Sequence, residues 1–170
     1  LCPRMGDCYT RTIKVEEILE DAVVTILEKC ASKHQDQLCL SGMRLTIMPN
    51  IFEVSDDLFN LVDVNLSRNQ LFNGNKVFQI LSQLPGLKKL NLSFNSLNGV
   101  LSDTLGAMTS LEVLHLDNNQ ITGFPTNTDG WINLKTLTAS ENSIREIPAE
   151  AMSWISLVYL NLRKNLIDNL

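Results

Sequence analysis

Few residues of this 170-residue chain have the types and spacing that catalytic chemistry requires. There are two histidines, His34 and His115, and a carboxylate closely follows the second at Asp117. A histidine paired with a carboxylate activates a nucleophile, but the spacing places no nucleophile near this pair. Neither histidine has the neighbours of a metal site, and no phosphate loop, paired-carboxylate motif or nucleophile elbow occurs. We therefore predict no catalytic residue, no metal ligand and no cofactor.

A spacing of apolar residues and asparagine, LxxLxLxxNxL, occurs five times in the C-terminal two thirds of the chain. The copies begin at Leu61, Leu87, Leu111, Leu134 and Leu157, so successive copies start 26, 24, 23 and 23 residues apart. A decayed sixth copy precedes them, in which Leu38, Leu40 and Leu45 keep the apolar positions and Met43 replaces the asparagine. The chain therefore contains about six units of one repeat.

The pattern within each copy predicts a strand with one buried face, because the leucines at positions four and six alternate with polar residues. A single unit cannot bury this row, whereas stacked units share a core and pair their strands into a curved parallel sheet. The repeated asparagine fits a structural role, since a buried amide satisfies backbone groups that a tight bend leaves unpaired. We predict a scaffold ladder of Asn69, Asn95, Asn119, Asn142 and Asn165.

This spacing resembles the leucine-rich repeat family over residues 36–170. The resemblance implies an α/β solenoid, with a curved parallel sheet on the concave side and helical or irregular segments on the convex side. The compact convex segments around Pro125 and Pro148 look like those of intracellular members of the Ras-suppressor kind. Apolar residues between Leu71 and Pro85 recur at helical spacing, which predicts a helix in that unit. Resemblance to this family implies protein partners most often.

Residues 1–35 differ from the repeats. Val15, Ile18, Leu19, Ala22, Ile26 and Cys30 fall at helical spacing, and acidic residues occupy the other side, which predicts an amphipathic helix from about Thr12 to Ser32. We expect this helix to cap the first strand of the repeat domain. At the opposite end no polar unit follows Asn165 before Leu170, so we expect a continuation or another chain to cover that edge.

The register also predicts which side chains face the concave side. Positions three, five, seven and eight of each copy are expected to point there, and most of them are small and polar. Aromatic and arginine side chains dominate the energetics of many interfaces, although single exposed apolar residues are also ordinary. The candidate partner-binding residues are Arg68, Phe94, His115, Asn118, Glu141, Tyr159 and Arg163.

Charge and cysteine usage indicate the setting. The net charge is −5 and the basic residues are scattered, so we predict no nucleic-acid partner, and no apolar run predicts membrane insertion. Secreted family members often carry cysteines near the first strand, as Cys2, Cys8, Cys30 and Cys39 do here. Cys30 and Cys39 are expected to point apart, which disfavours a disulfide between them. We predict reduced cysteines and a cytoplasmic location, with an extracellular one as the alternative.

Three functions are compatible with these features. The first is a non-enzymatic protein-interaction module that binds a partner through the concave face or the ends of the solenoid, as an adaptor or subunit of an intracellular assembly. The second is an extracellular receptor or adhesion ectodomain with an N-terminal cysteine cap. The third is a regulatory domain of a longer multidomain enzyme.

Overall fold

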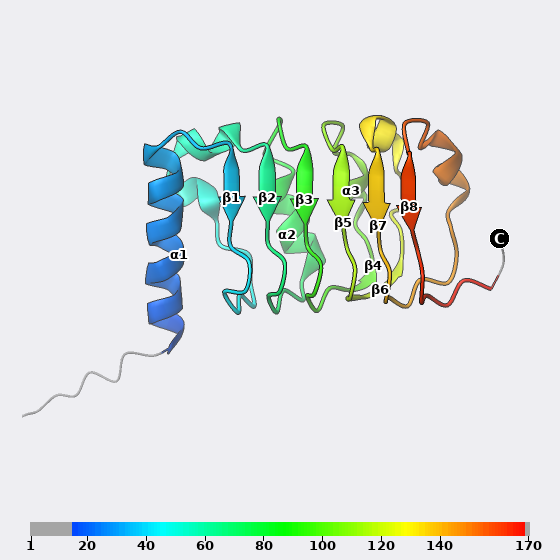
Figure 1. Cartoon of the computed structure of the whole chain (residues 1–170), viewed down its shortest axis with the longest axis horizontal. Coiled ribbons are helices and arrows are strands. Elements are labelled where there is room, and N and C mark those ends of the chain that lie inside the picture. Colours follow the sequence, from blue (N-terminus) through cyan, green and yellow to red (C-terminus); the bar gives the residue numbers. More distant parts are fainter. Residues whose placement is uncertain (1–14, 169–170) are drawn as a thin grey trace, which may run out of the picture.

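Six three-residue strands stand side by side along the length of the molecule (Figure 1). The computed structural model describes residues 15–168. All neighbouring strands pair in parallel and in register, so that Leu90 lies opposite Val64 on one side and Leu114 on the other. The strands are β1 (Gln37–Cys39), β2 (Asp63–Asn65), β3 (Lys89–Asn91), β5 (Val113–His115), β7 (Thr136–Thr138) and β8 (Tyr159–Asn161). The predicted solenoid and its register are confirmed, including the decayed first copy.

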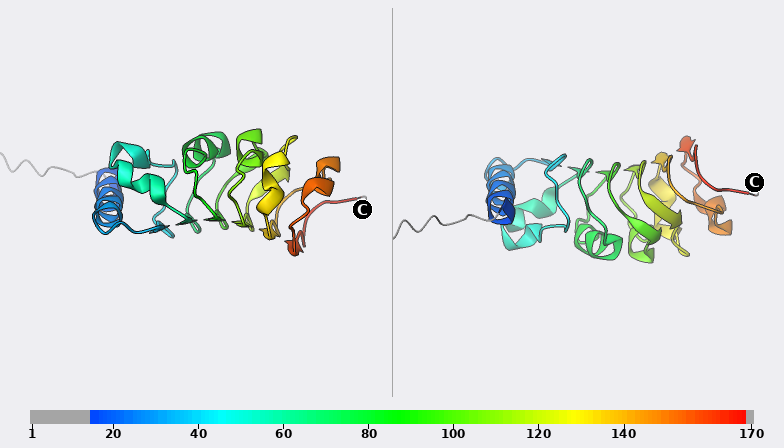
Figure 2. Two further views of the ribbon diagram at one scale, coloured as in Figure 1. Left: turned by 90° about the horizontal axis from the view of Figure 1, so that it is seen from above. Right: turned by 90° about the horizontal axis from the view of Figure 1, so that it is seen from below.

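The return segments lie on the other side of the molecule from this sheet (Figure 2). Helix α2 (Gly74–Leu81) is the helix that the spacing after Leu71 predicts. The other return segments carry α3 (Asp103–Gly106) and the 3-10 helices η1 (Ile51–Glu53), η2 (Asp56–Asn60), η3 (Asp129–Asn133) and η4 (Ala149–Ser153). A second, two-stranded parallel sheet of β4 (Asn98–Val100) and β6 (Gln120–Gly123) was not expected from the sequence.

The core runs through the solenoid between the sheet and the return segments. Leu92 and Leu116, at position six of neighbouring copies, are both 0% exposed, as the predicted inward orientation requires. One repeat unit, which we call a rung, is too thin to exclude water by itself. The burial of these leucines therefore depends on the rungs on either side. At β8 the described residues cover one side only, and Leu160 is 42% exposed where its counterpart Leu137 is 0% exposed.

The asparagine ladder connects each rung to the one before it. The amide nitrogen of Asn95 donates to the carbonyl oxygens of Leu66 and Leu92, both at 3.0 Å, and its Oδ1 accepts from the Leu71 N–H at 3.0 Å. Asn69, Asn119, Asn142 and Asn165 make the same set of bonds in their own rungs. The predicted scaffold role of these residues is confirmed by this geometry.

Helix α1 (Val15–Ser32) stands at the first end of the stack, beside β1 (Figure 1). Its residues Val23, Leu27, Cys30 and Ala31 are buried and belong to the continuous apolar core. Thr12, the expected first residue of the helix, lies outside the described residues, as do Cys2 and Cys8. The helix therefore contributes apolar side chains where a preceding rung would otherwise do so.

We predict that Leu116→Ala lowers the free energy of unfolding by about 2 to 5 kcal/mol, because the truncation leaves a cavity between two rungs. Urea denaturation measures the change, and Val158→Ala, at a largely exposed aliphatic position, serves as the control. Equal stability of the two variants would show that Leu116 does not lie in the core.

Replacement of Asn95 by alanine is expected to cost about 1 to 3 kcal/mol, because the Leu71 N–H loses the acceptor that it has in the fold. Thermal and urea unfolding of Asn95→Ala should be compared with those of Asn98→Ala, which removes an exposed amide. A loss of stability no larger in Asn95→Ala than in this control would contradict the scaffold role of the ladder.

Candidate protein-interaction surface

A hydrogen-bonded group of polar side chains occupies the middle of the concave face, across β3, β5 and β7. The Asp117 carboxylate accepts from the Thr138 hydroxyl, and from the Ser140 hydroxyl and backbone N–H at 2.5 and 2.8 Å. The Ser93 hydroxyl lies 3.5 Å from the same carboxylate. His115 Nδ1 lies 2.9 Å from the Thr138 hydroxyl oxygen. We call these five residues the concave polar network.

The single proton of the Thr138 hydroxyl determines which atom is the donor in its hydrogen bond with His115. That proton is donated to the Asp117 carboxylate, so the Thr138 oxygen is an acceptor toward His115, and Nδ1 must carry the hydrogen. In a nucleophilic triad the histidine lies between the hydroxyl and the carboxylate, whereas here the hydroxyl lies between the other two groups. The network therefore orients His115 and ties neighbouring rungs together, instead of activating Thr138 as a nucleophile.

The eighth position of each copy lies in a turn and not on a strand. Five successive copies place a non-glycine residue there with φ between 55° and 58°, and the first copy has Gly42 at φ 73°. The strand alternation on which the predicted concave orientation rests does not extend to this position, because a left-handed residue leaves the strand direction. These side chains form a row beyond the strand ends, which we call the turn ridge: Arg68, Phe94, Asn118, Glu141 and Lys164.

Neighbouring members of the turn ridge interact in pairs. The Arg68 guanidinium carbon lies 5.1 Å from the centroid of the Phe94 ring, a cation–π arrangement that contributes about 0.5 to 1 kcal/mol at an exposed site. At the other end, Lys164 Nζ lies 2.5 Å from Glu141 Oε1. Asn118 is half-buried between these pairs. The ridge thus presents an aromatic and cationic end and an ion-paired end.

The structure groups some of the predicted residues and separates others. Arg68 contacts Phe94, and His115 belongs to the concave polar network. Tyr159, 53% exposed, lies on β8 opposite Thr136, and Arg163 is exposed after the same strand. The seven predicted residues therefore form a discontinuous surface over five rungs and not one cluster.

The predicted set of partner-binding residues omits five residues of this surface, Ser93, Asp117, Thr138, Ser140 and Lys164. Their register was readable, since they occupy positions five, seven and eight of their copies. The missing signal was the pairing across rungs, because Thr138 and Ser140 are adjacent to Asp117 only once neighbouring strands are aligned. A small hydroxyl residue on a strand also looks like ordinary surface until its acceptor is known.

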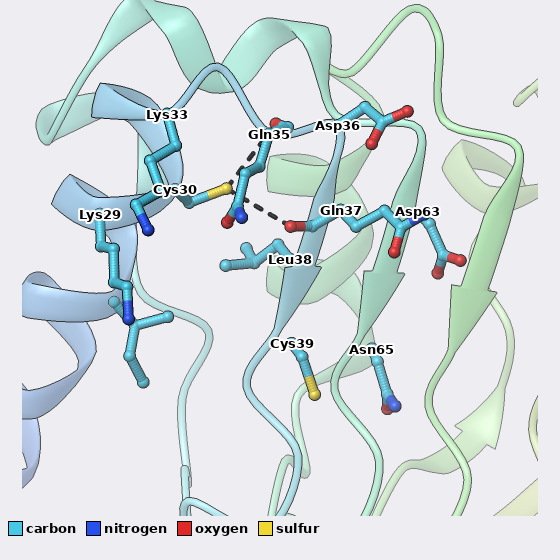
Figure 3. A pocket seen from close by; sticks show the side chains of 11 residues that line it. Lys29, Cys30, Lys33, Gln35, Asp36, Gln37, Leu38, Cys39, Asp63 and Asn65 are labelled. Atoms are coloured by element: carbon cyan, nitrogen blue, oxygen red, sulfur yellow. Dashed lines mark hydrogen bonds between the residues drawn. The ribbon is translucent and has the colours of Figure 1, made fainter.

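A second feature is a groove of about 660 Å³ between α1 and β1 (Figure 3). The Cys30 thiol is at its upper end and donates to the carbonyl oxygens of Gln37 and Gln35, at 3.5 and 3.8 Å. Burial, and secondarily the negative charge of Asp36, raises the pKa of this thiol, which keeps it protonated as a donor. Cys39 is exposed on β1.

Two further features are absent from residues 15–168. No three histidine, cysteine, aspartate or glutamate side chains of this part are grouped so that they could hold a metal ion. None of its helices combines the length and the apolar character that crossing a membrane requires.

Comparisons with known proteins agree with this architecture. The Leucine Rich Repeat family model matches residues 86–108 and 110–129. Receptor-like protein kinase 7 of Arabidopsis thaliana is 42% identical over 67 residues, which are 39% of this chain and 7% of that protein. The leucine-rich repeat domain of a Shigella effector superposes with a TM-score of 0.65 and 26% identity, over 88% of this chain and 59% of that one.

The third comparison is with a plant receptor. The leucine-rich repeat ectodomain of the Arabidopsis thaliana membrane receptor kinase GASSHO1/SCHENGEN3, solved in complex with CASPARIAN STRIP INTEGRITY FACTOR 2, gives a TM-score of 0.63 and 29% identity. That match covers 78% of this chain and 16% of the receptor chain. The chain thus spans only part of each of these three proteins. Its six registered rungs, its asparagine ladder and these matches identify it as a leucine-rich repeat protein.

Proposed function

We propose that this chain is a non-enzymatic recognition module that binds a protein or peptide through the turn ridge and the adjoining concave face. Leucine-rich repeat domains generally mediate protein–protein interactions, and solenoids provide extended concave surfaces for this purpose. The observation that carries the proposal is Phe94, an aromatic side chain that is 47% exposed although the residues before and after it, Ser93 and Asn95, are buried. An aromatic side chain in this position provides a binding anchor.

The frame around Phe94 favours binding because it is already ordered. The Phe94 backbone has a left-handed φ of 58°, which costs a non-glycine residue about 1 kcal/mol, and its N–H donates to the Asp117 carbonyl oxygen at 2.8 Å. Arg68 restricts the ring from the neighbouring rung. A side chain whose position is fixed before binding loses less conformational entropy when a partner covers it.

We place this activity in the cytoplasm, as part of a larger assembly. The exposed thiol of Cys39 and the protonated thiol of Cys30 suit a reducing compartment. Asn65 and Asn91, the two glycosylation sequons, lie opposite each other on adjacent strands, and each accepts a hydrogen bond from the backbone N–H two residues on. Glycans on both would crowd one another, which favours their remaining unmodified.

An extracellular receptor ectodomain is the second candidate, favoured by the similarity to the plant receptor ectodomain. In that setting the module would be one part of a much longer protein. The same is true of the third candidate, a regulatory domain of a multidomain enzyme. The full reading frame and the oxidation state of the cysteines separate these settings from the first.

Phe94→Ala and Tyr159→Ala are each expected to leave the midpoint of thermal unfolding close to that of the wild type, because both side chains are about half exposed. Partner capture by the full-length protein from its native cells should fall at least about tenfold with both changes, as for loss of interface anchors. The matched control is Phe72→Ala, at a 50% exposed phenylalanine outside the ridge, which should capture normally. Undiminished capture by the double variant, or recovery of RNA in place of a protein, would contradict the proposal.

Mass spectrometry of the native full-length protein tests the cytoplasmic setting. After denaturation without reductant, we expect all four cysteines to react with an alkylating reagent and Asn65 and Asn91 to carry no glycan. Alkylation only after reduction, or a glycan at either asparagine, would favour the extracellular candidate.

A further inference from the structure

The outer edge of β1 has backbone groups without partners, and they open into the groove beside α1. In a parallel ladder, alternate residues of a strand bond to the same neighbour. Here the Asp36 carbonyl accepts from the Asp63 N–H, and the Leu40 N–H donates to Asn65, so the groups of even-numbered residues face β2. The N–H and C=O groups of Gln37 and Cys39 therefore face the opposite way, toward α1.

Only one of these outward groups is satisfied within the described residues. The Gln37 carbonyl oxygen accepts from the Cys30 thiol at 3.5 Å, a weak donor that leaves the second lone pair of this oxygen free. No hydrogen bond joins the Gln37 N–H, the Cys39 N–H or the Cys39 carbonyl to another described residue. The edge can thus form a further ladder with an extended chain.

The groove beside this edge has room for a short strand. Its volume of about 660 Å³ extends along the whole of β1, and the facing wall consists of Ile26, Lys29 and Cys30 of α1 and of Lys33, just after that helix (Figure 3). Two of the residues that line it, Leu38 and Cys30, are almost fully buried. Among residues 15–168 the outer edge of β8 is also unpaired but has no such wall, so a strand added there would gain fewer side-chain contacts from this part of the chain.

The walls determine which side chains fit. Leu38 points into the core and its neighbours Gln37 and Cys39 point out, so a strand paired with β1 turns one central residue inward toward Leu38 and Ile26. The two flanking residues turn to the concave side. Lys29 lies on α1 and Lys33 directly follows the helix, so both ammonium groups lie along that wall for carboxylates at the flanking positions. The carboxylates of Asp36 and Asp63 line the strand side of the groove.

We propose that the α1–β1 groove binds an extended peptide segment of a partner protein as an additional parallel strand, with an apolar residue between two acidic ones. The central residue donates its N–H to the Gln37 carbonyl oxygen and accepts from the Cys39 N–H, which repeats the bonding between the other rungs. This site is separate from the turn ridge. Binding here is independent of Phe94 and Tyr159, so each proposal fails or stands without the other.

The test uses a synthetic peptide with blocked ends, Thr-Glu-Val-Glu-Thr, and the full-length protein. Amide hydrogen exchange followed by NMR should show the Cys39 amide protected at least about tenfold at saturating peptide. The Leu38 amide is the internal control, since it faces β2 and its exchange should not change. A peptide with every backbone nitrogen methylated keeps the side chains and should not bind.

Charge reversal at the groove provides the second measurement. Lys29→Glu with Lys33→Glu should weaken binding of the acidic peptide at least about tenfold, whereas Lys76→Glu, at an exposed lysine of α2, should bind it normally. Unchanged Cys39 exchange at about 1 mM peptide would overturn the proposal. Equal binding of the methylated peptide, or of one with lysines in place of the glutamates, would also overturn it.

Discussion

One amide side chain per rung makes this array a single structure. A short strand followed by a sharp bend leaves backbone groups that must find partners away from water, and an asparagine satisfies both a donor and acceptors at once. Because each of these amides bonds to its own rung and to the rung before it, neighbouring bends are held in fixed register. The leucines then share one core, which no single rung could enclose.

The surface features follow from this constraint. The bend before each asparagine requires a left-handed residue, and the same backbone conformation recurs in successive rungs as the turn ridge. Side chains of very different chemistry are thus held at equal intervals, and Arg68 meets Phe94 while Glu141 meets Lys164. The scaffold fixes the positions of these side chains, so only the residue types at these positions can determine which partner binds. The same logic produces the open edge of β1, where the ladder of strands ends against a helix.

The scaffold could be predicted from the sequence because the same spacing of leucines and asparagine occurs five times, which fixes the register of the strands. Strand positions, the buried leucines, the asparagine ladder and α2 all follow from spacing, and the structure confirms them. The sequence was insufficient where side chains from different rungs meet. The bond between Thr138 and Asp117 depends on alignment of strands more than twenty residues apart, and the turn position of Phe94 depends on a φ angle that its residue type disfavours. The second sheet of β4 and β6 lay in segments without clear alternation.

Native-state amide hydrogen exchange tests the central role of the ladder most directly. The N–H groups of Leu45, Leu71, Leu97, Ile121 and Ile144 donate to the side-chain oxygens of the five asparagines, and they are the donors to follow. If the ladder holds the rungs together, the three central amides should exchange as slowly as the strand-end amides of Leu66, Leu92 and Leu116, by opening of the whole array. Exchange at the rate of an exposed turn would show that the bends open independently, which would contradict the claim that the asparagine ladder holds the rungs together.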